Sequence, residues 1–131
     1  KLVEYPFPRN LEYTSYCVFP DELERDDHVL FHATPSKNFE SIVREGFQIP
    51  DPNAKEGLPS VTFAKRSSAA LDHAMRRRDS QPGEYCIFAV RYSSLCHQHI
   101  KINSCDIHDY RLDPQPKIIG YCRIPATYLH L

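Results

Sequence analysis

Residues 28–49 read HVLFHATPSKNFESIVREGFQI, and this stretch contains the strongest pattern in the chain. It starts with a short apolar run, His28–Ala33, which predicts a β-strand. After Ser36, which can serve as an N-cap, apolar residues recur at helical spacing. The glycine that follows, Gly46, is a common end of a helix. The stretch therefore predicts a strand that leads directly into a helix over residues 37–45.

The rest of the chain continues with strands and one further helix. That second helix begins at Ser67 or Ser68 and runs to about Arg78, and Tyr85–Tyr92 is apolar enough to be a central strand. Further strands are expected at Glu12–Phe19, Val61–Ala64, His99–Ile102 and Lys117–Arg123, with loops at Pro20–Asp27, Pro50–Pro59 and Ser93–Asp109. Two early helices followed mostly by strands indicate an α+β domain.

Length and composition narrow the class of protein. The chain has 131 residues, of which 41% are hydrophobic and 25% charged, so we expect one globular domain over residues 1–131. A net charge of −1 gives no general attraction to nucleic acid or anionic membranes. No apolar run approaches the roughly 20 residues that a membrane helix needs. We therefore expect no membrane partner.

The cysteines and the first residue bear on where the protein works. Its five cysteines are odd in number and scattered, which argues against a disulfide framework. This favours an intracellular location, cytoplasmic or nuclear. The chain begins with Lys1 rather than Met, which is consistent with a module of a larger protein.

A motif at the end of the first strand suggests a family. His32-Ala33-Thr34 is followed by Asn38-Phe39, with Ile and Gly at the next helical positions. This pattern resembles the opening signature of the ADP-ribosyltransferase (ART) superfamily, in its PARP-like, diphtheria-toxin-like branch. In that family the strand ends in His-Gly-(Ser/Thr), so Ala33 replaces the usual Gly.

Shorter stretches extend the resemblance over residues 28–131, and residues 1–27 would be an N-terminal extension packed on that part. These stretches are Ser60–Ala64, Ser67–Ala70, Gly83–Val90 and Lys117–Tyr121. The resemblance implies a split β-sandwich of two small, mainly antiparallel sheets with two helices. It also implies a cleft for NAD between the sheets.

The resemblance further implies NAD as substrate and transfer of ADP-ribose to a protein or nucleic-acid acceptor. His32 would hydrogen-bond the adenine-side ribose, and the main chain of Ala33 would hold the nicotinamide amide. Nicotinamide leaves through an oxocarbenium-like state, which demands close positioning. The implied NAD-binding residues are His32, Ala33, Thr34, Phe63, Ser67 and Arg111.

The implied catalytic triad, His32, Thr62 and Lys117, is degenerate. Thr62 stands where the family has a Tyr that stacks on nicotinamide, and Lys117 stands where it has the catalytic Glu. Three functions stay open. The first is a mono-ADP-ribosyltransferase, and the second is an inactive ART-like pseudoenzyme that serves as a binding module. The third is a relative of the RNA 2′-phosphotransferases, because the turn Ile124–Leu129 resembles the turn that ends their C-terminal strand.

Two clusters of polar residues have plainer explanations. Cys96–His99 and Cys105–His108 contain possible zinc ligands, but the Cys-x-x-Cys spacing of strong zinc motifs is absent. We therefore expect no metal site. Arg76–Arg78 suits the C-terminal end of a helix, where cations complement the helix dipole.

Overall fold

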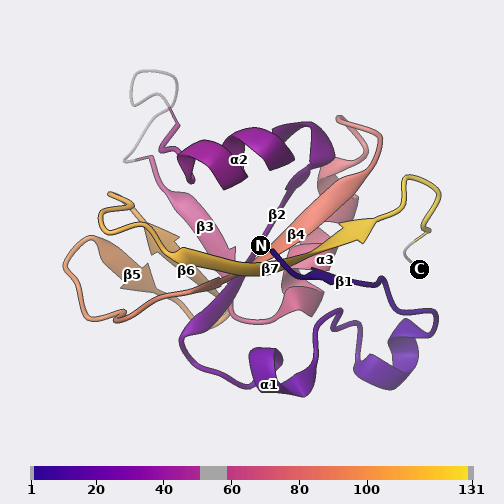
Figure 1. The fold of residues 1–131 in the computed structure, drawn as a ribbon, viewed down its shortest axis with the longest axis horizontal. Helices are drawn as coiled ribbons and strands as arrows, with labels where there is room; N and C mark the ends of the chain where they lie inside the picture. Colours follow the sequence, from indigo (N-terminus) through magenta and orange to yellow (C-terminus); the bar gives the residue numbers. More distant parts are fainter. Residues whose placement is uncertain (1, 51–58, 130–131) are drawn as a thin grey trace.

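The computed structural model describes residues 2–50 and 59–129. A mixed sheet of seven strands forms its centre, with helices on both sides (Figure 1). The strands follow the order β1-β7-β4-β2-β3-β6-β5. Their bounds are β1 (Glu4–Tyr5), β2 (Val29–Pro35), β3 (Val61–Ala64), β4 (Tyr85–Arg91), β5 (Ile100–Ile102), β6 (Asp106–Asp109) and β7 (Lys117–Ile124). The helical elements are η1 (Leu11–Thr14), α1 (Asp21–Glu24), η2 (Ser36–Asn38), α2 (Phe39–Glu45) and α3 (Ser67–Arg77). The α+β class is therefore confirmed.

The two longer helices cover opposite faces of the sheet. On one face, Ala70, Leu71 and Ala74 of α3 join a buried cluster that includes Phe31. On the other face, α2 packs on a second buried cluster, which contains Phe63. Most members of this cluster are strand residues that alternate with those of the first cluster, so their side chains point to the opposite face. Two apolar clusters on the two faces of one sheet give a three-layer domain.

β4 forms the middle of the sheet. Six of its residues in a row, Tyr85–Val90, are fully buried, because helices or chain segments cover both faces and strands lie on both sides. It pairs antiparallel with β2 on one side and with β7 on the other. This confirms the central strand expected from the continuous apolar run.

A split in the sheet lies between β2 and β3. β2 pairs with β4 over seven residues, Val29 to Pro35, whereas among the described residues β2 and β3 are in register at one position, Phe31 opposite Ala64. The described strands thus form one hydrogen-bonded sheet, and not the two separate sheets that the resemblance implied. Past the Phe31–Ala64 pair, no strand within residues 2–50 and 59–129 pairs with this edge of β2.

Most expected elements are present within one or two residues. The helix over residues 37–45 appears as η2 followed by α2, and the second helix, α3, ends at Arg77. The strands expected at Val61–Ala64, Tyr85–Tyr92, His99–Ile102 and Lys117–Arg123 correspond to β3, β4, β5 and β7. The loop expected at Pro50–Pro59 falls mainly on residues 51–58, which lie outside the described residues.

Three expectations were wrong in part. Glu12–Phe19 does not form a strand, because η1 covers its first residues and then Ser15 and Tyr16 take positive φ angles of 53° and 65°. The acidic turn Pro20–Asp27 contains the short helix α1. The polar loop Ser93–Asp109 contains β6, which pairs with both β3 and β5.

The N-terminal segment packs onto the face covered by α3. Leu11, Val18 and Phe19 are buried in the cluster on that face, and β1 adds a parallel edge strand beside β7. Among residues 2–50 and 59–129, no helix is long and apolar enough to cross a membrane.

Candidate functional site

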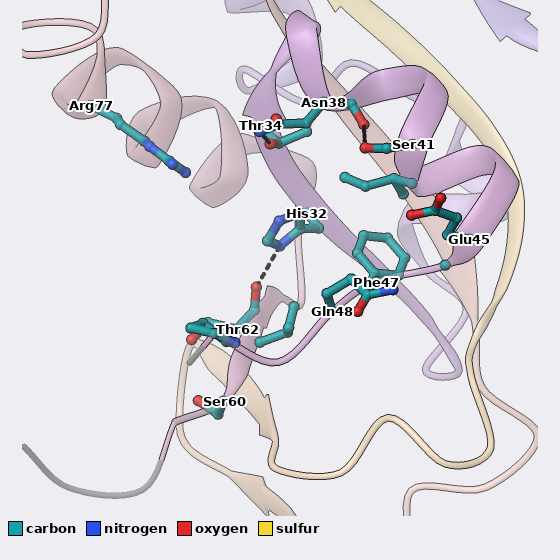
Figure 2. Close-up of a pocket in the computed structure, with 14 residues that line it drawn as sticks. His32, Thr34, Asn38, Ser41, Glu45, Phe47, Gln48, Ser60, Thr62 and Arg77 are labelled. Carbon is teal, nitrogen blue, oxygen red and sulfur yellow. Dashed lines mark hydrogen bonds between the residues drawn. The ribbon is translucent and has the colours of Figure 1, made fainter. Parts of the chain in front are cut away.

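The gap between β2 and β3 opens into a cavity of about 440 Å³ (Figure 2). Its walls come from β2, α2, the start of β3 and the end of α3, and its polar lining includes His32, Thr34, Asn38, Ser60, Thr62 and Arg77. A smaller hollow of about 150 Å³ lies against α3 and shares His32, Thr62 and Arg77 with the first. We call these two adjoining hollows the groove. The larger one has the size of a small-ligand site.

His32 is placed in the wall of the groove by β2. Its Nδ1 lies 2.9 Å from the main-chain oxygen of Thr62 across the split. A carbonyl oxygen only accepts, so Nδ1 carries the hydrogen in this contact. Nε2 is then left as a hydrogen-bond acceptor when the ring is neutral.

The surroundings of His32 keep its imidazole neutral. Burial lowers the pKa of His32, and the nearby positive charges of Arg77 and His73 lower it further, although the hydrogen bond to Thr62 acts in the opposite direction. A histidine that is uncharged at neutral pH can accept a hydrogen bond from a hydroxyl group of a ligand.

Two aromatic rings hold the His32 ring in place. The centroid of the His32 ring lies 5.3 Å from that of Phe47 and 5.5 Å from that of Phe63. Phe63 is 0% exposed and packs against the His32 ring from within the core, and it is not among the residues that line the groove. Its predicted contact with NAD is therefore replaced by a packing role.

Thr34 links β2 to the helix that follows. Its side chain is buried, and its Oγ1 accepts a hydrogen bond of 2.9 Å from Nδ2 of Asn38. Neither η2 nor α2 begins with a side-chain cap, so Ser36 does not serve as the expected N-cap. Thr34 and Asn38, both from the motif, instead fix the strand-to-helix connection and line the groove.

Ser67 lies outside the groove, in a buried contact at the start of α3. Its hydroxyl donates to the carboxylate of Glu24, its main-chain N–H donates to the same carboxylate over 3.2 Å, and its Oγ accepts from the N–H of Val18 over 2.8 Å. Ser67 therefore joins the N-terminal segment to α3, and the structure does not bring it to the predicted NAD site.

Two further predicted residues are also remote from the groove. Lys117 is exposed and lines a different hollow, of about 130 Å³, together with Arg91, His97 and His99. Arg111 is exposed in the loop after β6, where its main-chain N–H donates to Asp109 over 3.0 Å. Of the predicted set, the groove brings together His32, Ala33, Thr34 and Thr62.

The groove contains residues that sequence reasoning missed. Arg77 lines both hollows, and Figure 2 shows it pointing from α3 toward His32. Arg77 lies four residues after His73, so the helical period could have placed both on one face. Ser60 and Thr62 are joined to His108 of β6, which the sequence placed in a loop. The polar alternation of Asp106 and His108 was too short to reveal a strand.

The cysteines and histidines near β5 do not come together as a metal-binding cluster in the described residues. Cys96 and Cys105 are both exposed and free, and the rings of His97 and His99 stack on each other at 5.0 Å. Within the described residues no group of three or more His, Cys, Asp or Glu side chains could hold a metal ion.

We compared the chain with protein-family models, with curated proteins and with solved structures, and none of them matches it. The likeness to the ART superfamily therefore rests on the motif around His32.

Proposed function

We propose that the groove binds NAD and that the chain is an NAD-dependent mono-ADP-ribosyltransferase-like domain. The observation that carries this proposal is the state of His32. Its Nδ1 is committed to Thr62, its pKa is lowered, and it lines a cavity of about 440 Å³. Nε2 of a neutral imidazole is a suitable acceptor for a ribose hydroxyl.

The charge of the groove suits a dinucleotide. Arg77 is exposed at the end of α3 and lines both hollows, and His73 lies one turn earlier beside it. A guanidinium group binds phosphate oxygens well because its planar fork offers several N–H donors. Arg77 is therefore our candidate for the diphosphate of NAD.

The split in the sheet offers main-chain groups as well. Past the Phe31–Ala64 pair, β2 lines the groove at Ala33, and none of the described strands pairs with that edge there. Main-chain N–H and C=O groups on such an edge need partners. A carboxamide such as that of nicotinamide has the complementary donor and acceptor.

The lining also supports transfer of a single ADP-ribose over formation of a polymer. Among the described lining residues the carboxylate is that of Glu45, which is exposed on α2, and Lys117 lies elsewhere. Elongation of a polymer needs a carboxylate that activates a ribose hydroxyl. The same observation favours our second candidate, an ART-like module that binds a nucleotide without transferring it.

The turn after β7 gives little support to an RNA 2′-phosphotransferase. The guanidinium of Arg78 donates to the main-chain oxygens of Tyr128 and Pro125 over 2.6 and 2.9 Å. The Ile124–Leu129 turn thus has a packing role, because it fastens the C-terminal segment to α3.

Calorimetry with NAD tests the proposal. We expect His32→Ala to remove NAD binding and Arg77→Ala to weaken it by roughly tenfold, about 1.4 kcal/mol. The matched controls are His28→Ala and Arg76→Ala, because both side chains are exposed and lie outside the groove. Circular dichroism checks that each variant is folded.

Release of nicotinamide, measured by mass spectrometry, then separates the two candidates. Binding with release supports a transferase, whereas binding without release supports the binding module. If the wild-type protein does not bind NAD, or if His32→Ala binds it as well as the wild type, the proposal is wrong.

A further inference from the structure

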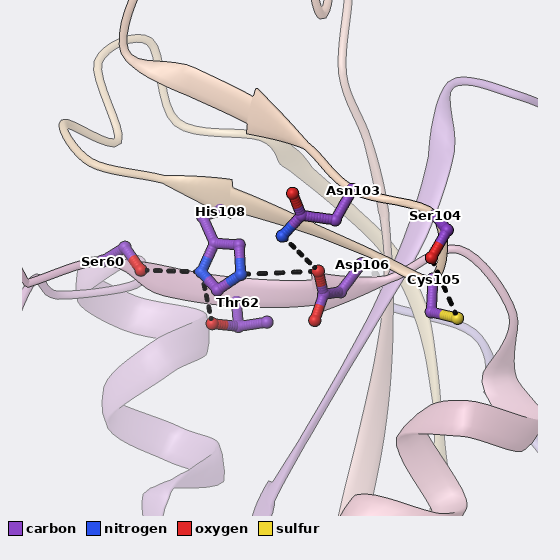
Figure 3. Close-up of polar contacts among 7 residues, drawn as sticks. All are labelled: Ser60, Thr62, Asn103, Ser104, Cys105, Asp106 and His108. Carbon is purple, nitrogen blue, oxygen red and sulfur yellow. Dashed lines mark hydrogen bonds and ion pairs between the residues drawn. The ribbon is translucent and has the colours of Figure 1, made fainter.

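A second polar group adjoins the groove at the start of β3 (Figure 3). Nδ1 of His108 lies 3.1 Å from Oγ of Ser60 and 3.1 Å from Oγ1 of Thr62. Nε2 of the same ring lies 3.4 Å from Oδ1 of Asp106. Asp106 in turn accepts a hydrogen bond of 3.0 Å from Nδ2 of Asn103.

The pairing of β3 with β6 brings these side chains together. Thr62 is directly opposite His108, and Ala64 is opposite Asp106. Alternate residues of a strand point to the same face, so Ser60 lies on the face of Thr62 and Asp106 lies on the face of His108. This is the face covered by α3, where Ala64 is buried.

The partners of His108 decide which of its nitrogens carries a hydrogen. An ionised carboxylate only accepts, so the nearby Asp106 favours the tautomer of His108 that carries its hydrogen on Nε2. Nδ1 then holds a lone pair directed at the two hydroxyl groups, both of which can donate. The distance of 3.4 Å to Asp106 is long for a hydrogen bond, but such contacts commonly tighten when a ligand binds.

This arrangement has the three parts of an activated nucleophile: a hydroxyl, a base within hydrogen-bond reach, and a group that orients the base. Asn103 adds a fourth member because it fixes the carboxylate of Asp106. The side chains of His108 and Asp106 are 26% and 29% exposed. They are therefore partly shielded from water, and the hydroxyl groups of Ser60 and Thr62 connect His108 to the groove.

Ser60 is the better nucleophile of the two hydroxyl residues. Both line the larger hollow of the groove. Thr62 lies inside β3 and uses its main-chain oxygen to hold His32. Ser60 precedes β3, and its primary hydroxyl is less hindered than the secondary hydroxyl of Thr62.

We propose that Ser60 is a nucleophile of the groove, with His108 as its proton acceptor and Asp106 as the positioning residue. The natural electrophile is the ribose carbon of NAD that bears nicotinamide, and this choice rests on the proposed function. The Oγ of Ser60 bonds to that carbon as the bond to the nicotinamide nitrogen breaks. The Ser60 proton moves to Nδ1 of His108, and neutral nicotinamide leaves. Ser60 then carries one ADP-ribose.

The first experiment needs no NAD and so tests Ser60 separately from the proposed function. The full chain is treated with a phosphonyl fluoride probe, which reacts with activated serine: the Oγ–P bond forms, fluoride leaves and the proton passes to His108. Peptide mass spectrometry is expected to find the probe on Ser60. Ser60→Ala and His108→Gln should lose the labelling, whereas the exposed control Ser93→Ala should keep it.

The role of Asp106 has its own spectroscopic signature. Nitrogen-15 NMR of the histidine rings should show His108 with its hydrogen on Nε2. Asp106→Asn should disturb this tautomer and slow labelling by about tenfold or more. A merely structural Asp106 would leave the tautomer as it is.

The second experiment adds NAD and maps the modified residue by mass spectrometry. One ADP-ribose on Ser60, absent from Ser60→Ala, supports the whole proposal. Labelling of Ser60 by the probe without any binding of NAD supports the nucleophile and refutes the proposed function. Probe labelling that is equal in wild type and Ser60→Ala overturns the inference, and so does ADP-ribose on another residue.

Discussion

His32 is neutral in the folded protein, and this makes stability depend on pH. Its pKa is lowered from 6.5 on folding, mainly by burial. Below pH about 6.5 the unfolded chain therefore binds a proton that the folded chain does not. The free energy of unfolding should fall with falling pH in that range, with a slope of up to about 1.4 kcal/mol per pH unit from this residue.

Urea unfolding at pH 7.5 and pH 5.5 tests this dependence. His32→Gln should lose that part of the pH dependence, since glutamine does not titrate. The exposed His28→Gln should keep it. Parallel pH profiles of wild type and His32→Gln would show that the pKa of His32 does not change on folding.

A second prediction concerns Glu24, which is 6% exposed. Its carboxylate accepts from the main-chain N–H groups of Phe19 and Ser67 and from the Ser67 hydroxyl. Glu24→Ala would leave these buried donors without an acceptor, at a cost of about 3 kcal/mol in the free energy of unfolding. The exposed Glu22→Ala, on the same helix, should change it by less than about 0.5 kcal/mol. Equal effects in urea unfolding would refute the structural role of Glu24.

The sequence located some site residues and misplaced others for a physical reason. His32 and Thr34 lie in one continuous strand-to-helix motif, so their neighbourhood follows from local structure. Lys117 and Ser67 were assigned through short, degenerate stretches, and their surroundings depend on long-range packing. The partner of Ser67 is Glu24, at a separation of 43 residues, which no local pattern can reveal.

Among the elements, the end of α2 depends on Gly46, which has a φ of +84°. A Cβ at this position would lie 2.9 Å from the side chain of Gln115. Gln115 cannot move freely, because it bonds both the N–H and the C=O of Phe47 over 3.0 and 2.8 Å. Gly46→Ala should therefore cost about 1–3 kcal/mol from the backbone conformation alone, since φ 84° with ψ 178° is open essentially to glycine, and more from the displaced Gln115.

Gly83→Ala is the matched control for this prediction. Its φ is +125°, but a Cβ at this position would meet nothing within 4 Å. Both variants carry backbone strain, but only Gly46→Ala adds a contact with Gln115, so Gly46→Ala should lose more of the unfolding free energy. A smaller loss for Gly46→Ala than for Gly83→Ala would contradict the anchoring of α2 by Gln115.

Elements with a long apolar run or a clear helical period were predictable from sequence. β4 and α3 are of this kind, and their bounds agree with expectation within two residues. β6 was missed because three of its four residues, Asp106, His108 and Asp109, are polar, and its place as a strand is set by pairing with β3, which is distant in the sequence. The aromatic run before α1 suggested a strand, but it pairs with no strand in the described structure and turns at Ser15 and Tyr16.

At the scale of the whole molecule, the five cysteines differ in how far they are exposed to solvent. Cys86 and Cys122 are 0% exposed, and burial raises the pKa of each thiol to about 12. Cys96 and Cys105 are exposed. Cys17 is intermediate, and burial followed by the charge of Glu24 raises its pKa.

Thiol labelling with a disulfide reagent at pH 8 should therefore proceed in stages. Cys96 and Cys105 should react quickly, Cys17 more slowly, and the two core thiols only in denaturant, because the thiolate is the reactive form. Cys96→Ser and Cys105→Ser should each remove part of the fast phase. Fast labelling of all five thiols would mean that the core opens readily.

The two edges of the sheet bear on how the molecule behaves at high concentration. One edge is β1, with two residues and Pro6 directly after it, and the other is β5, with three residues that include the exposed Lys101. Short edge strands, proline and lysine all discourage pairing with a strand of another molecule. Strand-by-strand growth into aggregates is thus opposed at both ends of the sheet, although its interior strands are strongly apolar.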